Sequence, residues 1–247
     1  MTLERAWLIL GASSAIARAF ARVAAEAGSD LVLAGRDLDD LGRTACDIRV
    51  RYARAVEVIA FDAADFDSHS EFVERVRSLA RRLDVFLAFG LMPTQAEIDA
   101  EPKLALQTIA ATYTGAVSAL SRLASVLAQQ GEGRVVVLGS VAGDRGRLKN
   151  YVYGSAKAGL HAYTQGLRAR LFRAGVTVTT IKPGFIDSPM TFGMRTGALM
   201  ASPEACARAC LRHSQRGREM AYFPPIWRLI MLIIREIPES LMKRLSF

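Results

Sequence analysis

Three residues in the second half of the chain have the types and the spacing to act on a carbonyl group. Ser140 precedes Tyr153, and Lys157 follows the tyrosine by four residues. Residues four apart share a helix face, so a helix that begins near Tyr151 would place phenol and ammonium side by side. A nearby cation favours the phenolate and lowers the phenol pKa. The pattern predicts a general acid or base, with the serine hydroxyl to hold the carbonyl oxygen. A surface pair that stabilises one helical turn is the alternative interpretation.

The start of the chain predicts a turn that binds a dinucleotide. Residues 6–10 are an apolar run, residues 11–17 read Gly-Ala-Ser-Ser-Ala-Ile-Ala, and an amphipathic pattern continues to Gly28. This order indicates a strand, a tight turn and a helix that the glycine ends. The free N–H groups of such a helix start would point at a pyrophosphate, whose negative charge the helix dipole favours.

Apolar runs alternate with amphipathic segments along the whole chain. Strands are expected near residues 6–10, 30–34, 55–61, 84–89, 133–138, 177–181 and 220–223. Because helical patterns separate them, we expect an α/β fold with one doubly wound, seven-stranded parallel sheet and helices on both faces. Ligands in such folds bind beyond the carboxyl ends of the strands, where all the motifs lie. Without a linker or a repeat, residues 1–247 are expected to form a single domain.

The ordered motifs resemble the short-chain dehydrogenase/reductase family over nearly the whole chain. The matching positions are Gly11, Asp62, Gly90, Ser140, Tyr153, Lys157, Pro183, Gly184 and Ser188. The resemblance implies a Rossmann-like fold and hydride transfer between a nicotinamide cofactor and a carbonyl or secondary alcohol. It also implies that Tyr153 exchanges the proton, that Ser140 bonds the oxygen, and that Lys157 holds the cofactor ribose and lowers the phenol pKa.

The same resemblance assigns cofactor contacts to residues that follow the strands. They are Gly11, Ser13, Ser14, Ala15, Ile16, Arg36, Asp62, Ala88, Gly90, Tyr153, Lys157, Pro183, Gly184, Ile186 and Ser188. Ser188 and the backbone of Ile186 would anchor the carboxamide of the nicotinamide. Asp62 would contact the adenine, with a cap of the following turn as the alternative. No metal is implied.

Five positions depart from the family pattern. Leu10, Ala15 and Ala17 stand where the family has Thr, Gly and Gly, and each added methyl narrows the approach of backbone to phosphate. Ala88 opens an Ala-Phe-Gly segment in place of Asn-Ala-Gly. Thr112 replaces a helical asparagine that carries a proton relay to the lysine, and it keeps a hydroxyl without the amide's two-sided hydrogen bonding. We expect weaker cofactor binding, with Thr112 as the fourth catalytic residue.

The end of the second strand bears on the choice of cofactor. Gly35 stands where a carboxylate would bind the adenosine ribose diol, and Arg36 follows it. A guanidinium there can pair with a 2′-phosphate. The sequence therefore favours NADP(H) over NAD(H), with a solvated loop as the alternative reading of Arg36.

Two segments bear on the substrate. Residues 144–149 are a basic stretch between Ser140 and Tyr153 that would suit an anionic substrate or form a solvated loop. The C-terminal apolar segment, residues 222–247, contains an apolar run much shorter than the roughly 20 residues that span a bilayer. We expect its apolar run to be buried in a homodimer or homotetramer contact, in a lipid-binding groove, or at a membrane surface.

Together with residues 88–92, 113–118 and 151–160, these two segments resemble one branch of the family, the decaprenylphosphoryl-2-keto-pentose reductases. That resemblance implies an NAD(P)H-dependent ketoreductase of a polyprenyl-phosphate 2-keto-pentose in cell-wall biosynthesis. Two alternatives stay open. One is a generic reductase or dehydrogenase of hydrophobic ketones or alcohols, and the other is a nucleotide-binding protein of the same fold with little turnover.

Composition and charge limit the cellular compartments and the partners that we expect for the protein. With 247 residues, of which 51% are hydrophobic, the chain can bury one large core. Three cysteines offer no disulfide framework, and no secretory pattern is apparent, so we expect a cytoplasmic protein, with the inner face of the membrane as a further location. The net charge of +8 would attract anionic lipid, and no motif supports a nucleic-acid partner. His69, His161 and His213 receive no catalytic role.

Overall fold

Seven parallel strands form the centre of the structure, a computed structural model that describes residues 2–193 and 197–245. They are β1 (Leu3–Leu10), β2 (Asp30–Gly35), β3 (Val56–Ala60), β4 (Ala80–Leu87), β5 (Gly133–Leu138), β6 (Val176–Pro183) and β7 (Met220–Phe223). The sheet order is β3-β2-β1-β4-β5-β6-β7, and each neighbouring pair is parallel. The strand order reverses between β1 and β4, which is the point where folds of this kind bind ligands. The predicted doubly wound α/β fold is confirmed.

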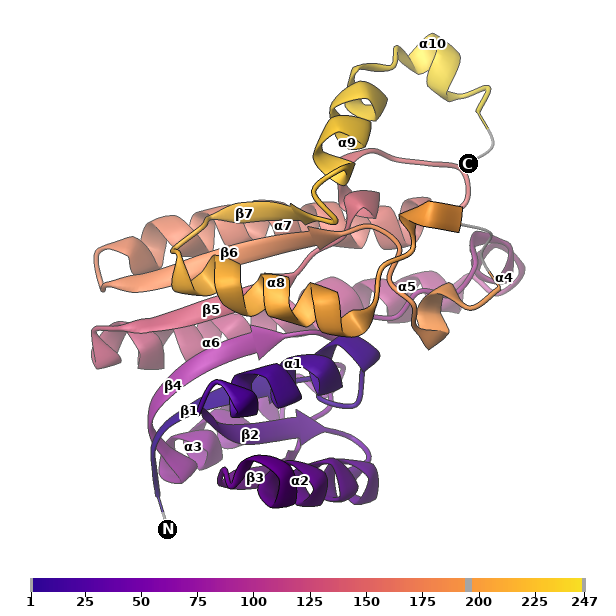
Figure 1. The fold of residues 1–247 in the computed structure, drawn as a ribbon. Coiled ribbons are helices and arrows are strands. Elements are labelled where there is room, and N and C mark those ends of the chain that lie inside the picture. Colours follow the sequence, from indigo (N-terminus) through magenta and orange to yellow (C-terminus); the bar gives the residue numbers. More distant parts are fainter. Residues whose placement is uncertain (1, 194–196, 246–247) are drawn as a thin grey trace.

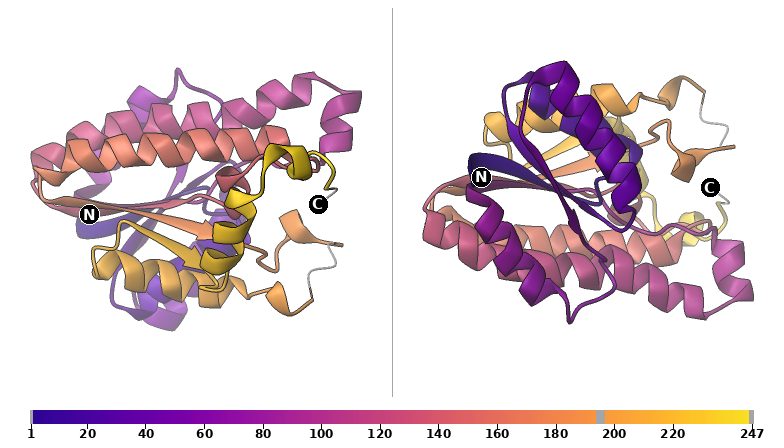
Figure 2. Two further views of the ribbon diagram at one scale, coloured as in Figure 1. Left: turned by 90° about the horizontal axis from the view of Figure 1, so that it is seen from above. Right: turned by 90° about the horizontal axis from the view of Figure 1, so that it is seen from below.

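Helices cover both faces of the sheet. The longer ones are α1 (Ala15–Glu26), α2 (Leu38–Tyr52), α3 (His69–Leu79), α6 (Gly115–Gln130), α7 (Tyr151–Phe172), α8 (Pro203–Gln215) and α9 (Trp227–Glu236). Shorter helical pieces are α4 (Gln95–Ala100), α5 (Lys103–Ile109), η1 (Ala110–Thr114), η2 (Val141–Asp144), η3 (Pro189–Thr191), η4 (Gly197–Leu199) and α10 (Glu239–Met242). Helices α1, α2 and α8 pack on one face, and α3, α6 and α7 pack on the other, so the sheet lies between two helical layers (Figures 1 and 2).

Side chains that alternate along each strand divide the core into two layers. In β1, Leu8 and Leu10 face α3, α6 and α7, whereas Trp7 and Ile9 face α1, α2 and α8. Because both faces are covered, the strands read as continuous apolar runs rather than alternating ones.

The predicted strands are confirmed in number and order, and the differences lie at their ends. β1 begins at Leu3 rather than at residue 6, and β4 spans Ala80–Leu87 rather than 84–89. Charged residues interrupt the apolar pattern at both strand starts. Arg5 of β1 and Arg82 of β4 are examples, and they lie side by side in the sheet. The other strands differ from the prediction by two residues or fewer at either end.

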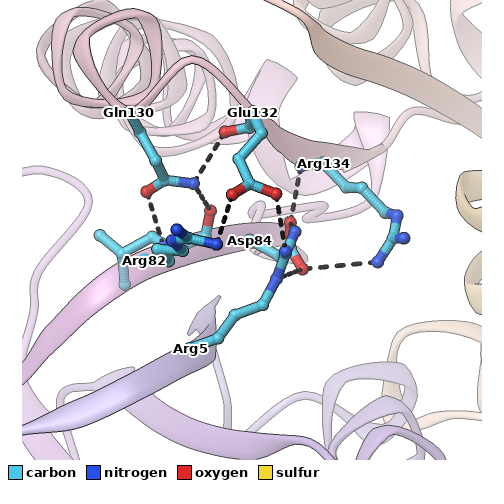
Figure 3. Close-up of polar contacts among 7 residues, drawn as sticks. Arg5, Arg82, Asp84, Gln130, Glu132 and Arg134 are labelled. Atoms are coloured by element: carbon cyan, nitrogen blue, oxygen red, sulfur yellow. Dashed lines mark hydrogen bonds and ion pairs between the residues drawn. The ribbon is translucent and has the colours of Figure 1, made fainter.

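An ion-pair cluster surrounds the amino-terminal ends of the central strands (Figure 3). Arg5 forms two hydrogen bonds of 3.0 Å with the carboxylate of Asp84, and a third of 3.0 Å with Glu132. The backbone N–H of Arg134 donates to the same aspartate at 2.7 Å, and Arg82 pairs with Glu132 at 2.7 Å. The Asp84 side chain is only 3% exposed, but its buried charge is matched by these partners.

Candidate active site

The predicted catalytic trio comes together where β5 ends and α7 begins. Ser140 follows β5 and is the N-cap of η2, where its hydroxyl accepts a hydrogen bond of 3.1 Å from Ala142 N. Tyr153 and Lys157 lie in the first two turns of α7, which begins at Tyr151 as expected. The lysine Nζ is 5.8 Å from the centre of the tyrosine ring, and the phenol also contacts the Ser140 hydroxyl. Both helix side chains are buried.

Lys157 carries a buried ammonium that few protein groups contact with a hydrogen bond or an opposite charge. Its Nζ donates a hydrogen bond of 2.8 Å to the carbonyl of Leu138, and no carboxylate of residues 2–193 or 197–245 forms an ion pair with it. Burial lowers the pKa of Lys157 to about 8. Since an ammonium has three donors, two remain for other acceptors such as ribose hydroxyls.

The phenol of Tyr153 departs from the expectation. Burial raises its pKa to about 12, and the contact with the Ser140 hydroxyl lowers it by a smaller amount. The prediction of a lowered phenol pKa is therefore wrong for the structure, because burial is the largest effect on this group. A phenol with a raised pKa keeps its proton at neutral pH, as a proton donor must, but it is a weaker acid than an ordinary tyrosine.

Thr112 lies on the π-helical turn η1, beside Gly90 and the lysine. Its hydroxyl accepts a hydrogen bond of 3.0 Å from Leu91 N and donates one of 3.3 Å to Leu91 O. A Cβ on Gly90 would lie 3.4 Å from Thr112 Oγ1 and 3.7 Å from Lys157 Nζ, so these groups share one small region. Single π-helical turns often occur at functional sites. Both of these hydrogen bonds join the Thr112 hydroxyl to the backbone of Leu91, so a proton relay through Thr112 stays a prediction.

The turn between β1 and α1 has the geometry of a phosphate-binding turn. Gly11 has a φ of +77°, and a Cβ there would lie 2.8 Å from the Cβ of Phe89, so only glycine fits. Ser14 is the N-cap of α1 and accepts a hydrogen bond of 3.2 Å from Ala17 N. Ala17 is fully buried in the core, so its extra methyl does not narrow the turn from the solvent side. The other predicted contacts are Ser13, which is exposed, and Ala15 and Ile16 in the first turn of α1.

The residues predicted after β2, β3 and β4 lie at the same edge of the sheet. Gly35 ends β2 and is buried, whereas Arg36 is exposed. The Asp62 carboxylate accepts a hydrogen bond of 2.9 Å from Ala64 N, so it does cap the following turn, and its adenine contact stays a prediction. Ala88 is buried after β4, and its N–H donates 3.0 Å to Leu10 O.

The loop after β6 carries the predicted carboxamide anchor. Pro183 is the last residue of β6, and the N–H of Gly184 donates 2.8 Å to Phe223 O. Ile186 and Ser188 are held together by Thr191, whose hydroxyl donates to Ile186 O and accepts 3.3 Å from Ser188 N. The anchor groups therefore lie on an ordered loop, and the glycine turn and Lys157 also fit a dinucleotide. Their contacts with a cofactor stay predictions.

Sequence reasoning missed the contribution of the C-terminal segment to this site. Trp227, the first residue of α9, packs on Val141, which follows the catalytic serine, and lies 5.3 Å from Phe185 between ring centres. A Cβ on Gly184 would lie 1.9 Å from the indole Nε1, so only glycine admits this ring. The apolar pattern of the segment indicated a buried helix face, but no sequence pattern identifies the surface that the face covers.

The basic stretch of residues 144–149 is not a solvated loop throughout. The Asp144 side chain is 4% exposed and accepts a hydrogen bond of 2.6 Å from the Tyr222 hydroxyl. Arg145 pairs with Glu239 at 2.7 Å. The solvated-loop alternative is therefore wrong for these two residues, which tie the segment to β7 and to α10.

A single class of protein combines this sheet with these residues. The all-parallel order, the glycine turn after β1 and the serine, tyrosine and lysine beyond β5 define a Rossmann-like enzyme that works with a dinucleotide. The family described as short chain dehydrogenase matches residues 5–198. The chain therefore belongs to the short-chain dehydrogenase/reductase family.

Known proteins of similar sequence agree with this assignment. An uncharacterized oxidoreductase of Mycobacterium tuberculosis is 35% identical over 239 residues, which are 96% of each chain. Another from Streptomyces coelicolor is 36% identical over 242 residues, 98% of this chain and 96% of the relative. The protein is an NAD(P)-dependent oxidoreductase that acts on a small-molecule substrate.

Solved structures share the fold at lower identity. A short-chain type dehydrogenase/reductase from Mycobacterium ulcerans aligns with a TM-score of 0.81 at 17% identity, over 99% of both chains. A variant of actinorhodin polyketide ketoreductase with NADPH aligns with a TM-score of 0.78 at 19% identity, over 90% of this chain and 97% of that one. At these identities the likeness concerns the fold alone.

Proposed function

We propose that the protein is an NADPH-dependent ketoreductase whose substrate is a polyprenyl-phosphate 2-keto-pentose. The observation that carries the reaction type is a buried Tyr153 beside the Ser140 hydroxyl and the Lys157 ammonium, where β5 ends. A protonated phenol suits reduction, in which the oxygen of a ketone must gain a proton.

The roles of the three side chains follow from their positions. When bound, the cofactor supplies the hydride. Tyr153 donates its proton to the ketone oxygen, while the Ser140 hydroxyl bonds the same oxygen and fixes its place. Lys157 would hold the cofactor ribose with its two remaining N–H groups. Its charge also stabilises the phenolate that forms when the tyrosine gives up its proton.

A preference for NADP(H) is supported by the residues after β2. Gly35 offers no carboxylate to repel a 2′-phosphate, and Leu41 fills the space beside it, 3.2 Å from the position of a Cβ. Arg36 is exposed, and it has no ion pair within the part of the chain that the structure describes. An unpaired guanidinium at this strand end can bind the phosphate bidentately.

An anionic substrate is supported by Arg147. Its Nε is buried without a hydrogen-bond partner, and burial lowers the pKa of its guanidinium. Within residues 2–193 and 197–245 no carboxylate pairs with it, whereas Arg145 two residues earlier is held by Glu239. The nearby Asp144 carboxylate opposes this lowering of the pKa but forms no ion pair with Arg147, so its unpaired Nε–H is suited to a phosphate group of a substrate.

The lipid part of the proposed substrate is supported by the C-terminal segment. Buried Trp227 and Met231 fasten one face of α9, but the opposite face and the end of the segment expose apolar side chains. These are Ile226, Leu229, Leu232, Ile233, Leu241 and Leu245. Arg228, Arg235, Lys243 and Arg244 are exposed in the same segment. In Figure 1, α9 and α10 project beyond β7 on the side where the strands end.

We propose that this face lies on an anionic membrane, at its cytoplasmic side, where a lipid-linked substrate would be found. Apolar side chains flanked by arginine and lysine match the boundary between acyl chains and anionic headgroups. No helix of residues 2–193 and 197–245 is long and apolar enough to cross a membrane. The expected homodimer or homotetramer stays a prediction, and contact with a second copy is the alternative occupant of this face.

Vesicle binding and oligomer size decide between these occupants. Sedimentation with phosphatidylglycerol vesicles should exceed that with phosphatidylcholine vesicles, and Ile233→Glu should weaken it about 10-fold. Val50→Glu is the matched control, because Val50 is 80% exposed on α2, away from this segment. Loss of a dimer in the Ile233 variant, without vesicle binding by the wild type, would contradict the membrane proposal.

A generic reductase of hydrophobic ketones is the second candidate. It is favoured by the apolar cluster of Val141, Phe185, Trp227 and Met231 beside Ser140. NADPH and NADH oxidation should be followed with a panel of ketones, with and without a polyprenyl-phosphate keto-pentose. The proposal expects the keto-pentose to be reduced with the highest kcat/KM and NADPH to be preferred. Equal rates with simple ketones support the second candidate, and binding without turnover supports a nucleotide-binding protein.

A further inference from the structure

His161 contacts the backbone of the catalytic serine. It lies on α7 one turn beyond Lys157, and its side chain is 7% exposed. The N–H of Ser140 donates a hydrogen bond of 3.3 Å to His161 Nε2. A ring nitrogen accepts a hydrogen bond only when it carries no proton, so this contact requires a neutral imidazole with its proton on Nδ1.

Asp144 supplies the partner that this tautomer needs. Its Oδ1 lies 3.5 Å from His161 Nδ1, on the side of the ring opposite to Ser140. Burial raises the pKa of Asp144, but the contact with His161 and the hydrogen bonds from Lys182 and Tyr222 outweigh this effect and lower the pKa to about 2. The carboxylate is therefore ionised at neutral pH, and it favours a proton on Nδ1.

Two glycines on either side of Ser140 make room for the ring. A Cβ on Gly139 would lie 2.4 Å from His161 Nε2, and a Cβ on Gly143 would lie 2.8 Å from His161 Cε1. Neither glycine has a positive φ, so close packing is the reason for glycine at both positions. At Gly139 the imidazole is the nearest group, whereas at Gly143 the backbone of Lys157 and Ala158 lies as close as the ring. The segment 139–143 therefore packs closely against the His161 ring and the backbone of α7.

We propose that His161, oriented by Asp144, is a positioning residue that fixes the backbone of Ser140 and thereby places its hydroxyl beside Tyr153. The inference rests on the proposed function for its kinetic consequences, because the hydroxyl matters only if it holds the substrate oxygen. Loss of the Nε2 acceptor lets the turn after β5 shift, and small displacements of a catalytic group cost large factors in rate.

Protonation of His161 would remove the acceptor and place two N–H groups against each other. The charged and titratable groups around the ring are Asp144 of η2, Lys182 of β6, Lys157 of α7 and, through the aspartate, Tyr222 of β7. Burial lowers the pKa of His161, and the two lysines add to this effect, while Asp144 opposes it. Turnover should therefore fall on the acid side, below the usual range of histidine.

Kinetics of two His161 variants test the inference. His161→Leu removes the acceptor and should lower kcat about 10- to 100-fold, with little change in the NADPH dissociation constant. His161→Gln can accept from Ser140 N but does not titrate, so it should restore most of kcat and abolish the acid limb of the pH profile. His213→Gln on α8 is the matched control and should keep both the wild-type kcat and the acid limb of the pH profile. An unchanged kcat in the leucine variant, or an unchanged acid limb in the glutamine variant, would overturn the inference.

A measurement without substrate separates this inference from the proposed function. Long-range 1H–15N NMR spectra of the histidine rings of the wild-type protein should show His161 at neutral pH with its proton on Nδ1. His161→Leu identifies the signal, or His161→Gln if the leucine variant does not fold. A proton on Nε2, or a doubly protonated ring, would overturn the positioning role even if the enzyme reduces ketones. The expected tautomer without turnover on any ketone would leave the contact intact and refute the function.

Discussion

Two polar clusters lie at opposite ends of the same strands, and they treat buried charge differently. At the amino-terminal ends, Asp84 faces Arg5 and Arg134, and the hydrogen bond from Arg5 to the aspartate raises the arginine pKa. At the carboxyl ends, Lys157 has a carbonyl as its protein partner, and burial lowers its pKa to about 8. The first cluster stabilises its buried charge with ion pairs, whereas the second holds a buried ammonium that has no ion pair among the described residues.

This difference distinguishes structure from function within one sheet. A buried charge with all its partners can be replaced only at a cost to folding, because removal of one member leaves the other unpaired. A buried cation without a counter-ion is unfavourable for folding, and groups with such perturbed pKa values gather at functional sites. Both clusters are polar and buried, so the pairing of their charges, rather than their composition, separates them.

Replacement of Lys157 should give the largest effect. Lys157→Met should lower turnover about 1000-fold, because the variant loses the charge that stabilises the phenolate and the donors for the ribose. The thermal midpoint should stay the same or rise, since a buried unpaired charge is replaced by an apolar chain of similar length. Steady-state kinetics and calorimetry measure the two effects. A large loss of stability would mean that the lysine belongs with the structural cluster.

Replacement of Asp84 should give the opposite result. Asp84→Asn removes the buried carboxylate that Arg5 and Arg134 share and should lower the free energy of unfolding by about 3 kcal/mol, with kcat/KM of the folded enzyme nearly unchanged. Glu4→Gln, which removes an exposed pair with Arg81, is the control and should cost less than about 1 kcal/mol. Urea denaturation measures both. Equal small losses in the two variants would contradict the structural role of the amino-terminal cluster.

The pH dependence separates activity from stability at Lys157. Its pKa of about 8 in the folded protein lies below the ordinary value of 10.5. Between these values the unfolded chain binds the proton and the folded one does not, so the contribution of this group to stability rises with pH. The ammonium is lost in the same range, so kcat/KM for ketone reduction should fall as pH rises through about 8. A rate that stays constant to pH 10 would disagree with the burial of this cation.

Replacement of Arg36 should give a smaller effect, limited to the cofactor. Arg36→Ala should weaken NADPH binding about 10-fold and leave NADH binding nearly unchanged. The matched control is Arg54→Ala, because Arg54 is partly exposed before β3, near the amino-terminal ends of the strands. Fluorescence titration with both cofactors measures the ratio. An equal loss for both cofactors would mean that Arg36 does not read the phosphate.

The features that depend on local residue spacing could be predicted from the sequence. Periodic apolar runs predicted the strands, and the four-residue spacing of Tyr153 and Lys157 predicted their shared helix face. The pKa of the tyrosine was predicted in the wrong direction, because its value depends on burial, and burial follows from the whole fold.

Contacts between distant segments were outside the reach of sequence patterns. Asp144, His161, Lys182 and Tyr222 come from η2, α7, β6 and β7, and they meet only after the sheet has formed. The position of His161 one turn after Lys157 was the available signal, because it indicates the same helix face. Spacing cannot reveal that Gly139 and Gly143 leave room for that ring.

The central claim is that Tyr153 donates the proton that a ketone gains during hydride transfer. The most direct test is NADPH oxidation by the wild type and by Tyr153→Phe with a ketone that the wild type reduces, alongside NADPH binding. The account predicts that the variant binds NADPH as tightly as the wild type and reduces the ketone at least about 100-fold more slowly. Equal rates for the two proteins would contradict it.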